Sequence, residues 1–493
     1  MGQEGKIEFL EKRQMKTSVI RYSELKEHDD WRWDSEYVCF YPRQNKALTY
    51  KRIGEILSFA QYGISIDMNE EGNGCKIYRM NEISTMFCDR GINKHATISK
   101  AQIAKFKLRN NDVLFNRTNS QEFVGRTGIF KKFSDEDIVF ASYLIRVRTN
   151  EDEVLPEYLT AFLNTKYGVQ DAKRRARISI NQSNINAEEL KRVKIPIISK
   201  NIQENIRKIF ALSFELVNKS ESLYSQAEQI LLSELDLLNW KPKYRLSFFK
   251  NFSDTKSGGR IDAEYFQPMY DEIVEKYKAK TQCLSLKKVT TLVGHPSNPP
   301  YAGGDSKDKT FVITQKYLGA YYPSDNFWED SEALYTTKEF TKKNKQFLLQ
   351  KNDIILYSVG AYIGKANIYN SDIQATIGSF LTLIRPDQTK INPYYLLVFL
   401  NSDFGKQLTR RCSRGMAQQY VYPFDIKEFA VPIIHATEQK GIEVKMLGAL
   451  NAKNLSKRLL DIAKRGVELA IEKNENDALG WIDAELKKLN ITV

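Results

Sequence analysis

The sequence repeats itself once, at the scale of a whole domain. Four short segments of the first half recur in the same order in the second half, each 228 to 241 residues further on. A solenoid is excluded, because its units are only about 20–50 residues long. The matched segments are Arg32–Tyr37 with Arg260–Tyr265, Asn111–Phe115 with Asn352–Leu356, Pro156–Leu159 with Pro393–Leu396, and Lys194–Ile198 with Ala430–Ile434. The chain therefore contains two related domains, which suggests two related sites.

A long heptad stretch follows each repeated domain. Apolar residues recur every seven positions from about 201 to 238, where no Pro or Gly intervenes, and again from about 438 to 473. Such a stripe predicts a helix packed lengthwise against another helix, and the matching stretch of the other repeat is the expected partner. Gly448 and Gly466 would let this partner approach closely. The heptad residues are Ile209, Leu216, Leu223 and Ile230, then Leu455, Ile462 and Leu469.

Each repeat has the pattern of a mixed α/β (α+β) domain. Asn-Asp pairs introduce short apolar strands, and the segment 142–148 alternates like a half-buried strand. Pro156 and Pro393 suit the first turn of a helix that ends near Asn164 or Asn401. We therefore expect domains at residues 1–200 and 260–436, long helices at 201–238 and 437–473, a connector at 239–259 with an exposed loop over 254–259, and a short helical extension at 474–493.

The amino-acid composition indicates what kind of molecule the chain binds. The chain has 74 Lys and Arg against 61 Asp and Glu, a net charge of +13. This surplus favours a polyanionic partner, usually nucleic acid, although a generally basic soluble protein would show the same balance. No segment approaches the roughly 20 apolar residues of a membrane span. The five cysteines are scattered and lack metal-binding spacing, which indicates reduced thiols and a cytoplasmic location.

Two motifs suggest catalysis but do not fit their context. Asn298–Tyr301 has the Asn-Pro-Pro-Tyr form with which adenine-N6 methyltransferases hold a flipped base, but a loop precedes it and no Gly-rich cofactor loop lies upstream. Gly360–Lys365 is one residue short of a phosphate-binding loop. The element that recurs in both repeats is a glycine followed by a cation, which predicts a turn presenting one positive side chain. Asp34 and Asp262 stand beside Arg and Tyr, which favours a salt bridge within the domain. We predict no catalytic residues.

An Arg-rich segment followed by a small-residue turn and a pair of amides precedes the Ile-Pro strand of each repeat. Arginine suits phosphates and guanine edges, and Asn and Gln suit adenine edges. An arginine-rich helix end with a polar cap would look the same, but the duplication favours DNA contact. We expect Arg175→Ala and Arg411→Ala to weaken DNA binding and its salt dependence. The predicted DNA contacts are Arg117, Asn119, Arg126, Arg174, Arg175, Arg177, Asn181 and Gln182, then Tyr362, Lys365, Arg410, Arg411, Arg414, Gln418 and Gln419.

Together, these segments resemble the DNA-specificity subunit of a type I restriction–modification system. The resemblance runs from about Arg32 to Lys473. It rests on the doubled order of the Arg-x-Asp-Ala/Ser-Glu-Tyr motif, the Asn-Asp strand with its later Gly-Arg/Lys, the Pro-x-Tyr-Leu helix, the Arg-rich segment and the long helix. It implies two target recognition domains, each gripping one half of a bipartite, asymmetric DNA sequence, with the long helices packed antiparallel as a spacer.

The resemblance also implies that the chain has no catalysis and no cofactor of its own. It would recruit two methyltransferase subunits, which bind S-adenosylmethionine, and two restriction subunits, which use ATP and Mg²⁺. Residues 58–110 and 294–350 barely match between the repeats, so specificity is expected there. Two alternatives stay open. One is a methyltransferase fusion that uses Asn298–Tyr301, and the other is a free-standing two-site DNA-binding protein.

Overall fold

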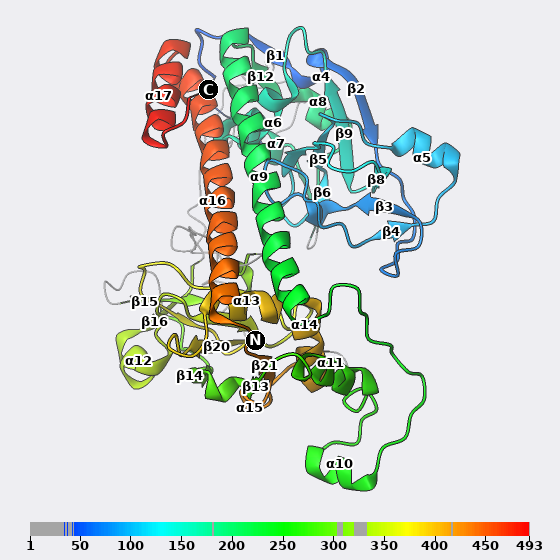
Figure 1. Cartoon of the computed structure of the whole chain (residues 1–493). Coiled ribbons are helices and arrows are strands. Elements are labelled where there is room, and N and C mark those ends of the chain that lie inside the picture. The colour runs from blue at the N-terminus through cyan, green and yellow to red at the C-terminus, as the bar shows by residue number, and fades with distance from the viewer. Residues whose placement is uncertain are drawn as a thin grey trace, which may run out of the picture. The chain divides into compact units, whose positions relative to one another are not determined.

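The computed structural model describes Asp34, Tyr37, Pro42 and residues 44–179, 182–302, 309–319, 333–415 and 418–492. The chain divides into two compact units, residues 1–217 with 453–493, and residues 218–452. Each unit contains one repeated domain and parts of both long helices (Figure 1). This differs from the sequence-based division, in which each long helix was a segment of its own. The reason is packing, since Ile206 lies in the core of the first unit and Leu231 in that of the second.

The first unit is built on an antiparallel sheet with the strand order β2-β9-β5-β7. β9 lies inside this sheet and is buried on both faces, so the half-buried strand predicted over 142–148 is wrong in burial and begins two residues too early. Smaller sheets have the orders β4-β3-β8, β10-β11-β6 and β1-β12. The elements are β1 Tyr50–Arg52, α4 Ile53–Ile56, β2 Leu57–Tyr62, β3 Cys75–Tyr78, β4 His95–Ala96, α5 Lys100–Phe106, β5 Val113–Asn116, β6 Thr118–Asn119, β7 Thr127–Ile129, β8 Ile138–Phe140, β9 Leu144–Thr149, α6 Pro156–Asn164, α7 Lys166–Arg174, β10 Arg177–Ser179, β11 Gln182–Asn184, α8 Ala187–Arg192 and β12 Lys194–Pro196.

The second unit repeats this topology. Its main sheet has the order β14-β20-β17-β18, and the smaller sheets are β16-β15-β19 and β13-β21. Both repeats pair one strand in parallel in the three-stranded sheet, β3 with β8 and β15 with β19. The predicted α/β class and the duplication are thus confirmed. The elements are α10 Phe252–Gly258, α11 Pro268–Lys278, β13 Cys283–Ser285, β14 Thr290–Gly294, β15 Lys309–Ile313, β16 Tyr335–Thr337, α12 Lys338–Lys343, β17 Ile354–Tyr357, β18 Ala366–Ile368, β19 Ala375–Ile377, β20 Leu381–Pro386, α13 Pro393–Asn401, α14 Asp403–Cys412, α15 Pro423–Ile426 and β21 Ala430–Pro432.

The Asn-Asp motif of each repeat closes the same turn. The Asn adopts a left-handed conformation, with φ of 70° at Asn111 and 72° at Asn352, which Asn tolerates better than most residues. The buried Asp that follows pairs with an arginine of the neighbouring strand. Asp112 accepts from Arg148, and Asp353 accepts from Arg385 through Nε and Nη2 at 2.8 and 2.7 Å. The motif is therefore part of the scaffold.

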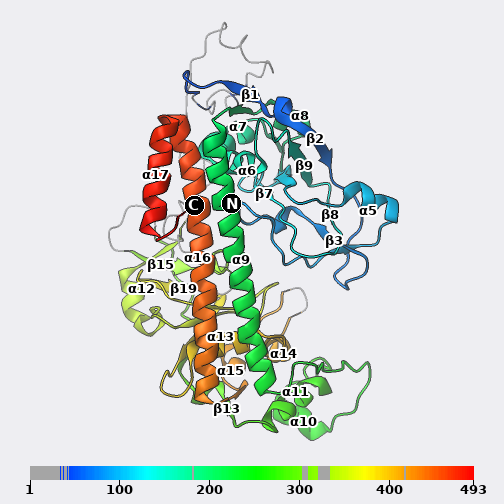
Figure 2. The same ribbon diagram turned by 45° about the horizontal axis from the view of Figure 1, so that its top comes forward.

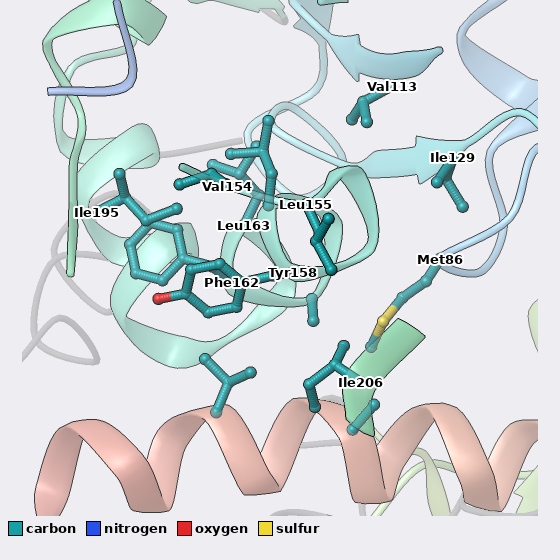
Figure 3. Close-up of a cluster of buried hydrophobic side chains, with 14 of the residues drawn as sticks. Met86, Val113, Ile129, Val154, Leu155, Tyr158, Phe162, Leu163, Ile195 and Ile206 are labelled. Atoms are coloured by element: carbon teal, nitrogen blue, oxygen red, sulfur yellow. The ribbon is translucent and has the colours of Figure 1, made fainter. Parts of the chain in front are cut away.

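The Pro-x-Tyr-Leu helices α6 and α13 have the predicted bounds, and each is fixed to the short strand of its repeat that ends in proline, β12 or β21. The Tyr158 hydroxyl donates to the Pro196 carbonyl at 2.6 Å, and the Tyr395 hydroxyl donates to the Pro432 carbonyl at 2.5 Å. In the first unit, Tyr158 and Phe162 of α6 gather with Ile195 and Ile206 in one apolar core (Figure 3). This core ties helix α6, strand β12 and the start of the long helix together.

The long helices are α9, Lys200–Glu234, and α16, Ala436–Glu472, close to the predicted ranges. Figures 1 and 2 both show them side by side. In the second unit, the Ser220 hydroxyl donates to the Ala449 carbonyl at 2.8 Å, and Lys445 Nζ donates to Gln226 Oε1 at 2.7 Å. Position numbers rise along one helix as they fall along the other, so the pair is antiparallel, as predicted.

Gln203 and Gln439 join each long helix to its own domain in the same way. Gln203 Oε1 accepts from the backbone N–H of Leu155 at 2.8 Å, and Gln439 Oε1 accepts from that of Asn392 at 2.9 Å. Their Nε2 groups donate to the backbone carbonyls of Ile198 and Ile434. The repeat thus extends into the long helices at the level of single hydrogen bonds.

Two predictions near the helices need correction. Gly448 faces α9 as expected, since a Cβ there would lie 3.0 Å from Leu223. At Gly466, however, a Cβ would lie 2.5 Å from Ile482, so this glycine makes room for α17, Glu475–Lys488, the predicted helical extension. The predicted loop over 254–259 is mostly helix, α10, which is capped by Gly259 in a left-handed conformation with φ of 61°.

Candidate DNA interface

In the first repeat, a β-hairpin follows helix α7. β10 and β11 pair antiparallel, and β11 also pairs with β6. Arg177 and Gln182 are exposed on this hairpin, and among the described residues the Arg177 side chain has no ion pair. Ile178 beside them is 49% exposed. The hairpin therefore offers a cation, an amide and an apolar side chain to a ligand. Asn181, a further predicted contact, lies outside the described residues.

The second repeat forms the corresponding hairpin with its backbone. Arg414 and Tyr420 exchange two backbone hydrogen bonds of 2.8 and 2.9 Å, as Arg177 pairs with Asn184 in the first repeat. The turn requires Gly415, which has φ of 94° and a Cβ of which would lie 2.3 Å from the Gln418 carbonyl oxygen. Gln418 and its neighbour Gln419 are exposed, as expected for residues that contact a ligand.

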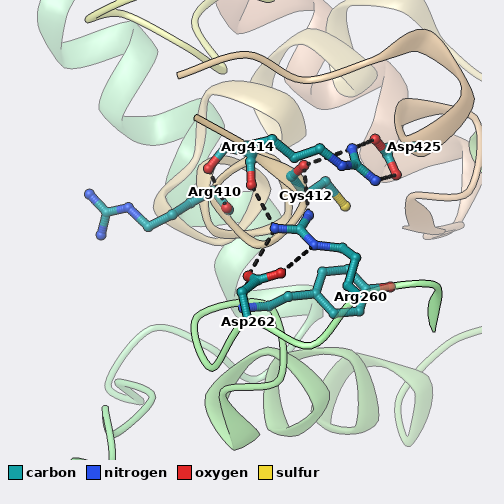
Figure 4. A network of polar contacts seen from close by, with 8 residues as sticks. Arg260, Asp262, Arg410, Cys412, Arg414 and Asp425 are labelled. Carbon is teal, nitrogen blue, oxygen red and sulfur yellow. Dashed lines mark hydrogen bonds and ion pairs between the residues drawn. The ribbon is translucent and has the colours of Figure 1, made fainter. Parts of the chain in front are cut away.

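Arg414 differs from Arg177 because its guanidinium already has a partner. Figure 4 shows it facing the Asp425 carboxylate, with Nη2 3.2 Å from Oδ1. The hydrogen bond to Asp425 raises the pKa of Arg414. The guanidinium also lies 5.6 and 5.3 Å from the ring centroids of Tyr422 and Phe424. Arg414 thus forms a cation–aromatic cluster that is partly open to solvent.

Arg117 and Asn119 hold the first hairpin in place. The Arg117 guanidinium donates to the Ser142 carbonyl and to Asn184 Oδ1, both at 3.3 Å, and lies 4.8 Å from the centroid of the Tyr62 ring. Asn119 is a partner of β11, and its side-chain oxygen accepts from the next backbone N–H. Both residues are only half exposed, so they position the hairpin as well as bordering it.

The predicted glycine turn is present in both repeats. Gly125 and Gly364 have φ of 88° and 87°. The cation that follows each glycine reaches back over an aromatic residue of the same turn. Arg126 is exposed and lies 4.0 Å from the Phe123 ring, whereas Lys365 is half-buried, 5.7 Å from the Tyr362 ring, and its Nζ reaches the Leu318 carbonyl at 3.4 Å. Tyr362 is the more open group of its turn, with 64% of its surface exposed.

Arg174 and Arg175 are a correction to the predicted DNA contacts. They are only 4% and 3% exposed, and both donate to Asp171 Oδ1, at 2.6 and 3.2 Å. Arg174 also lies 4.2 Å from the Tyr37 ring, and Arg175 lies 3.7 Å from Glu189. Burying an unpaired arginine would be very costly, so these pairs hold both guanidinium groups in the interior. The two arginines stabilise the domain beneath the hairpin.

In the second repeat, the two neighbouring arginines Arg410 and Arg411 differ in their surroundings. Arg411 pairs with Asp271 at 2.9 Å and lies 5.1 Å from the Tyr265 ring, so it matches Arg174 and is also structural. Arg410 is exposed, and Figure 4 shows its side chain directed away from the neighbouring ion pairs. Arg260 pairs with Asp262 at 2.7 Å, which confirms the salt bridge expected there. Arg410 is therefore the more open candidate contact, whereas the Arg411 side chain, 21% exposed, is held by Asp271.

The Asn-Pro-Pro-Tyr motif, Asn298–Tyr301, is not arranged as a base-binding pocket. Asn298 lies in an exposed loop after β14, and its side-chain oxygen accepts from the Ser379 hydroxyl at 3.2 Å. Among the described residues, no three His, Cys, Asp or Glu side chains are grouped as a metal site would require. Within the same residues, no helix is both long and apolar enough to cross a membrane.

Comparison with known proteins decides the family. The protein-family model of the type I restriction modification DNA specificity domain matches residues 45–220 and again residues 305–461, once in each repeat. The chain belongs to this DNA-specificity family. As a specificity subunit of a type I restriction–modification system, it is not itself an enzyme, and the methyltransferase fusion is not favoured.

The chain is also similar to individual specificity subunits. Over 427 residues the specificity subunit is 24% identical to the MjaX type I restriction enzyme specificity subunit of Methanocaldococcus jannaschii, covering 85% of this chain and 91% of that protein. It is 27% identical over 178 residues to the EcoKI specificity subunit of Escherichia coli K12, 36% of each chain. Among solved structures, the S subunit from M. genitalium aligns with 13% identity and a TM-score of 0.38, over 86% of this chain and 97% of that one.

Several exposed aromatic residues of this subunit are absent from the predicted contacts, and four of them stand next to β9, β20 or the second hairpin in the chain. Tyr143 and Phe380 precede β9 and β20, and Tyr422 and Phe424 follow the second hairpin. The first pair had a sequence signal, since Ser-aromatic-Leu occurs at the same place in both repeats. The alternation over 142–148 predicted a half-buried strand, however, and gave no sign that the aromatic residue lies outside it.

Proposed function

We propose that the two hairpins, one on each domain, bind the two halves of a bipartite, asymmetric duplex DNA target. The observation that carries this proposal is the doubled hairpin, which exposes Arg177 and Gln182 in one repeat and Gln418 and Gln419 in the other. Exposed cations and amides suit phosphates and base edges. The net charge of +13 also favours a polyanionic ligand.

The half-sites would differ because the domains differ outside their shared scaffold. The shared elements are the buried ion pairs, the central sheets and the long helices. Residues 58–110 and 294–350, which barely match, contain β3 and β4 in one repeat and β15 and β16 in the other. Equivalent sheets with unlike side chains are what two different recognition surfaces require.

The assembly we propose contains this chain with two methyltransferase subunits and two restriction subunits. S-adenosylmethionine, ATP and Mg²⁺ would bind to those partner subunits, and this chain would carry no cofactor. The family assignment supports partners of these kinds. Saturable binding of S-adenosylmethionine to this chain alone would contradict this distribution of roles.

Methylome sequencing tests the DNA target directly. Host DNA from cells that express this chain with its methyltransferase subunit should carry one methylated motif made of two unlike half-sites and a fixed gap. Replacing residues 58–110 with those of another family member should change one half-site and leave the other intact. A methylation pattern that does not depend on this chain would overturn the proposal, as would failure to co-purify with a methyltransferase subunit.

A further inference from the structure

An exposed aromatic ring occupies the same turn in both repeats. Tyr143, directly before β9, is 42% exposed, and Phe380, directly before β20, is 56% exposed. The leucine that follows each of them is fully buried at the start of the strand. The core is thus filled by Leu144 and Leu381, and neither aromatic ring is needed for it.

The backbone of the first turn is joined to the first hairpin through one residue. The Tyr143 carbonyl accepts from the N–H of Arg117 at 3.0 Å, and the Arg117 carbonyl accepts from the N–H of Ile185 at 2.8 Å, just after β11. Leu144 N–H also closes the turn on the Ala141 carbonyl at 3.0 Å. The ring therefore projects from a fixed backbone beside the hairpin.

The second repeat reproduces these bonds with a different linking residue. The Phe380 carbonyl accepts from the N–H of Ser358 at 3.2 Å, and the Ser358 carbonyl accepts from the N–H of Val421 at 2.9 Å, just after the second hairpin. Leu381 N–H closes the turn on the Gly378 carbonyl at 3.1 Å. The relation between ring and hairpin is the same although the side chain at the linking position is Arg in one repeat and Ser in the other.

The exposed ring is present in both repeats, although the stretches expected to carry specificity differ. We therefore expect the ring to contact a part of the DNA that the two half-sites have in common. Phe380 has no hydroxyl, so the shared role belongs to the ring and not to a hydrogen bond. The neighbouring hairpins present cations and amides, which suit a nucleic acid better than an apolar protein groove. Two different duplex half-sites share their sugar–phosphate backbone and their stacked base pairs, and an apolar ring suits the stack better than the charged backbone.

We propose that Tyr143 and Phe380 act as wedges that enter a base step of each half-site regardless of its sequence. Apolar side chains that enter a step partly unstack the bases and bend the duplex, and the bend increases the contact with protein. The inference rests on the proposed DNA-binding function. It adds a positioning contact that is independent of sequence, separate from the side chains that read the bases.

The test uses the full chain with its methyltransferase subunits and duplexes that carry the methylated motif. 2-Aminopurine, which fluoresces when unstacked, is placed at successive positions of each half-site. Apart from the target adenine, which the methyltransferase subunits flip, the complex with unchanged protein should show one bright position in each half-site. Phe380→Ala should remove the signal in one half-site, and Tyr143→Ala the signal in the other. Each should weaken binding about tenfold, since one base–aromatic stack is worth about that much.

Matched variants separate the ring from other effects. Tyr143→Phe should keep both the signal and the affinity, because only the hydroxyl is lost. Phe252→Ala removes a ring of α10 that is 73% exposed, away from either hairpin in the chain, and should change neither. The methylated sequence should be the same for all four variants.

Three results would overturn the inference. One is unchanged fluorescence and affinity in Phe380→Ala and Tyr143→Ala. Another is a changed methylated sequence, which would make these rings specificity residues. The third is loss of the methyltransferase subunit with unchanged DNA affinity, which would make the turn a protein contact. If Arg177→Ala weakens DNA binding while the ring variants do not, the wedge proposal is wrong and the proposed DNA-binding function stands. If the unchanged complex does not bind the motif, the proposed function itself fails.

Discussion

The Arg174 guanidinium lies over the ring of Tyr37, 4.2 Å from its centroid. The second repeat has the same relation between Arg411 and Tyr265 at 5.1 Å. An arginine placed near the C-terminus of a helix thus packs on the tyrosine of the Arg-x-Asp motif, more than 130 residues earlier in the chain. This stacking, together with the ion pair to Asp171 in the first repeat, makes these two arginines part of the scaffold.

Arg174→Ala should destabilise the first unit without removing a DNA contact. The change leaves Asp171 buried with one arginine fewer, and breaking a buried ion pair costs about 3–5 kcal/mol. We expect the lower end, since Arg175 still donates to Asp171. The midpoint of urea unfolding should fall clearly, whereas Arg177→Ala should change stability by no more than about 0.5 kcal/mol. Equal midpoints for the two variants would contradict the structural role.

Arg177→Ala should weaken DNA binding and lower its salt dependence. If the guanidinium contacts one phosphate, the slope of log affinity against log salt should fall by about 0.9. Titrations at several salt concentrations measure this slope. Arg207→Ala, which changes an exposed arginine of α9 instead, serves as the control and should keep the original slope. A slope that does not change in Arg177→Ala would remove this residue from the interface.

Gly415→Ala should damage the second hairpin more than Gly360→Ala does. Both glycines have a positive φ, 94° and 101°, so an alanine is strained by about 1–3 kcal/mol at either position. Only at Gly415 would the new Cβ collide with backbone, 2.3 Å from the Gln418 carbonyl oxygen, whereas Gly360 has nothing within 4 Å. DNA affinity should therefore fall more for Gly415→Ala. The reverse order would show that the hairpin turn does not shape the binding surface.

Glu472→Gln should lower stability at neutral pH but not in acid. Burial would raise the pKa of Glu472, but hydrogen bonds from Arg465 and Lys166 outweigh it and lower the pKa to about 2, from an ordinary 4.5. A lowered carboxyl pKa contributes stability that is complete above about pH 4.5 and disappears as the pH falls toward 2. The difference in urea midpoint between the two proteins should be constant from pH 7 to about 5.5 and shrink below 4.5. A difference that does not vary with pH would contradict this.

Periodicity and repetition were sufficient to predict the architecture. The heptads set the ranges of α9 and α16 to within a few residues, and proline set the start of α6 and α13. These are local properties of the chain, since helix periodicity and N-terminal proline act within one or two turns. The burial of β9 was not predictable in this way, because distant segments cover both of its faces. Ile145 packs in the core that contains Tyr158, and Leu144 packs in the core that contains Tyr78.

The candidate site was only partly predictable for the same reason. Arg175 and Arg177 are two positions apart, yet one is 3% exposed and the other lies open on β10. The i,i+4 spacing from Asp171 hinted at an ion pair for Arg175. Nothing local showed that Glu189 would close over it.

The sequence by itself determined that the chain is a duplicated α/β domain with two long helices, because each repeat contains the same ordered motifs. Only the tertiary structure decided which cations stay in the interior and which reach the surface. Burial of a guanidinium depends on carboxylates and rings brought from distant segments, such as Tyr37 beneath Arg174. Tertiary packing also leaves the Phe380 ring exposed, because the buried Leu381 beside it fills the core.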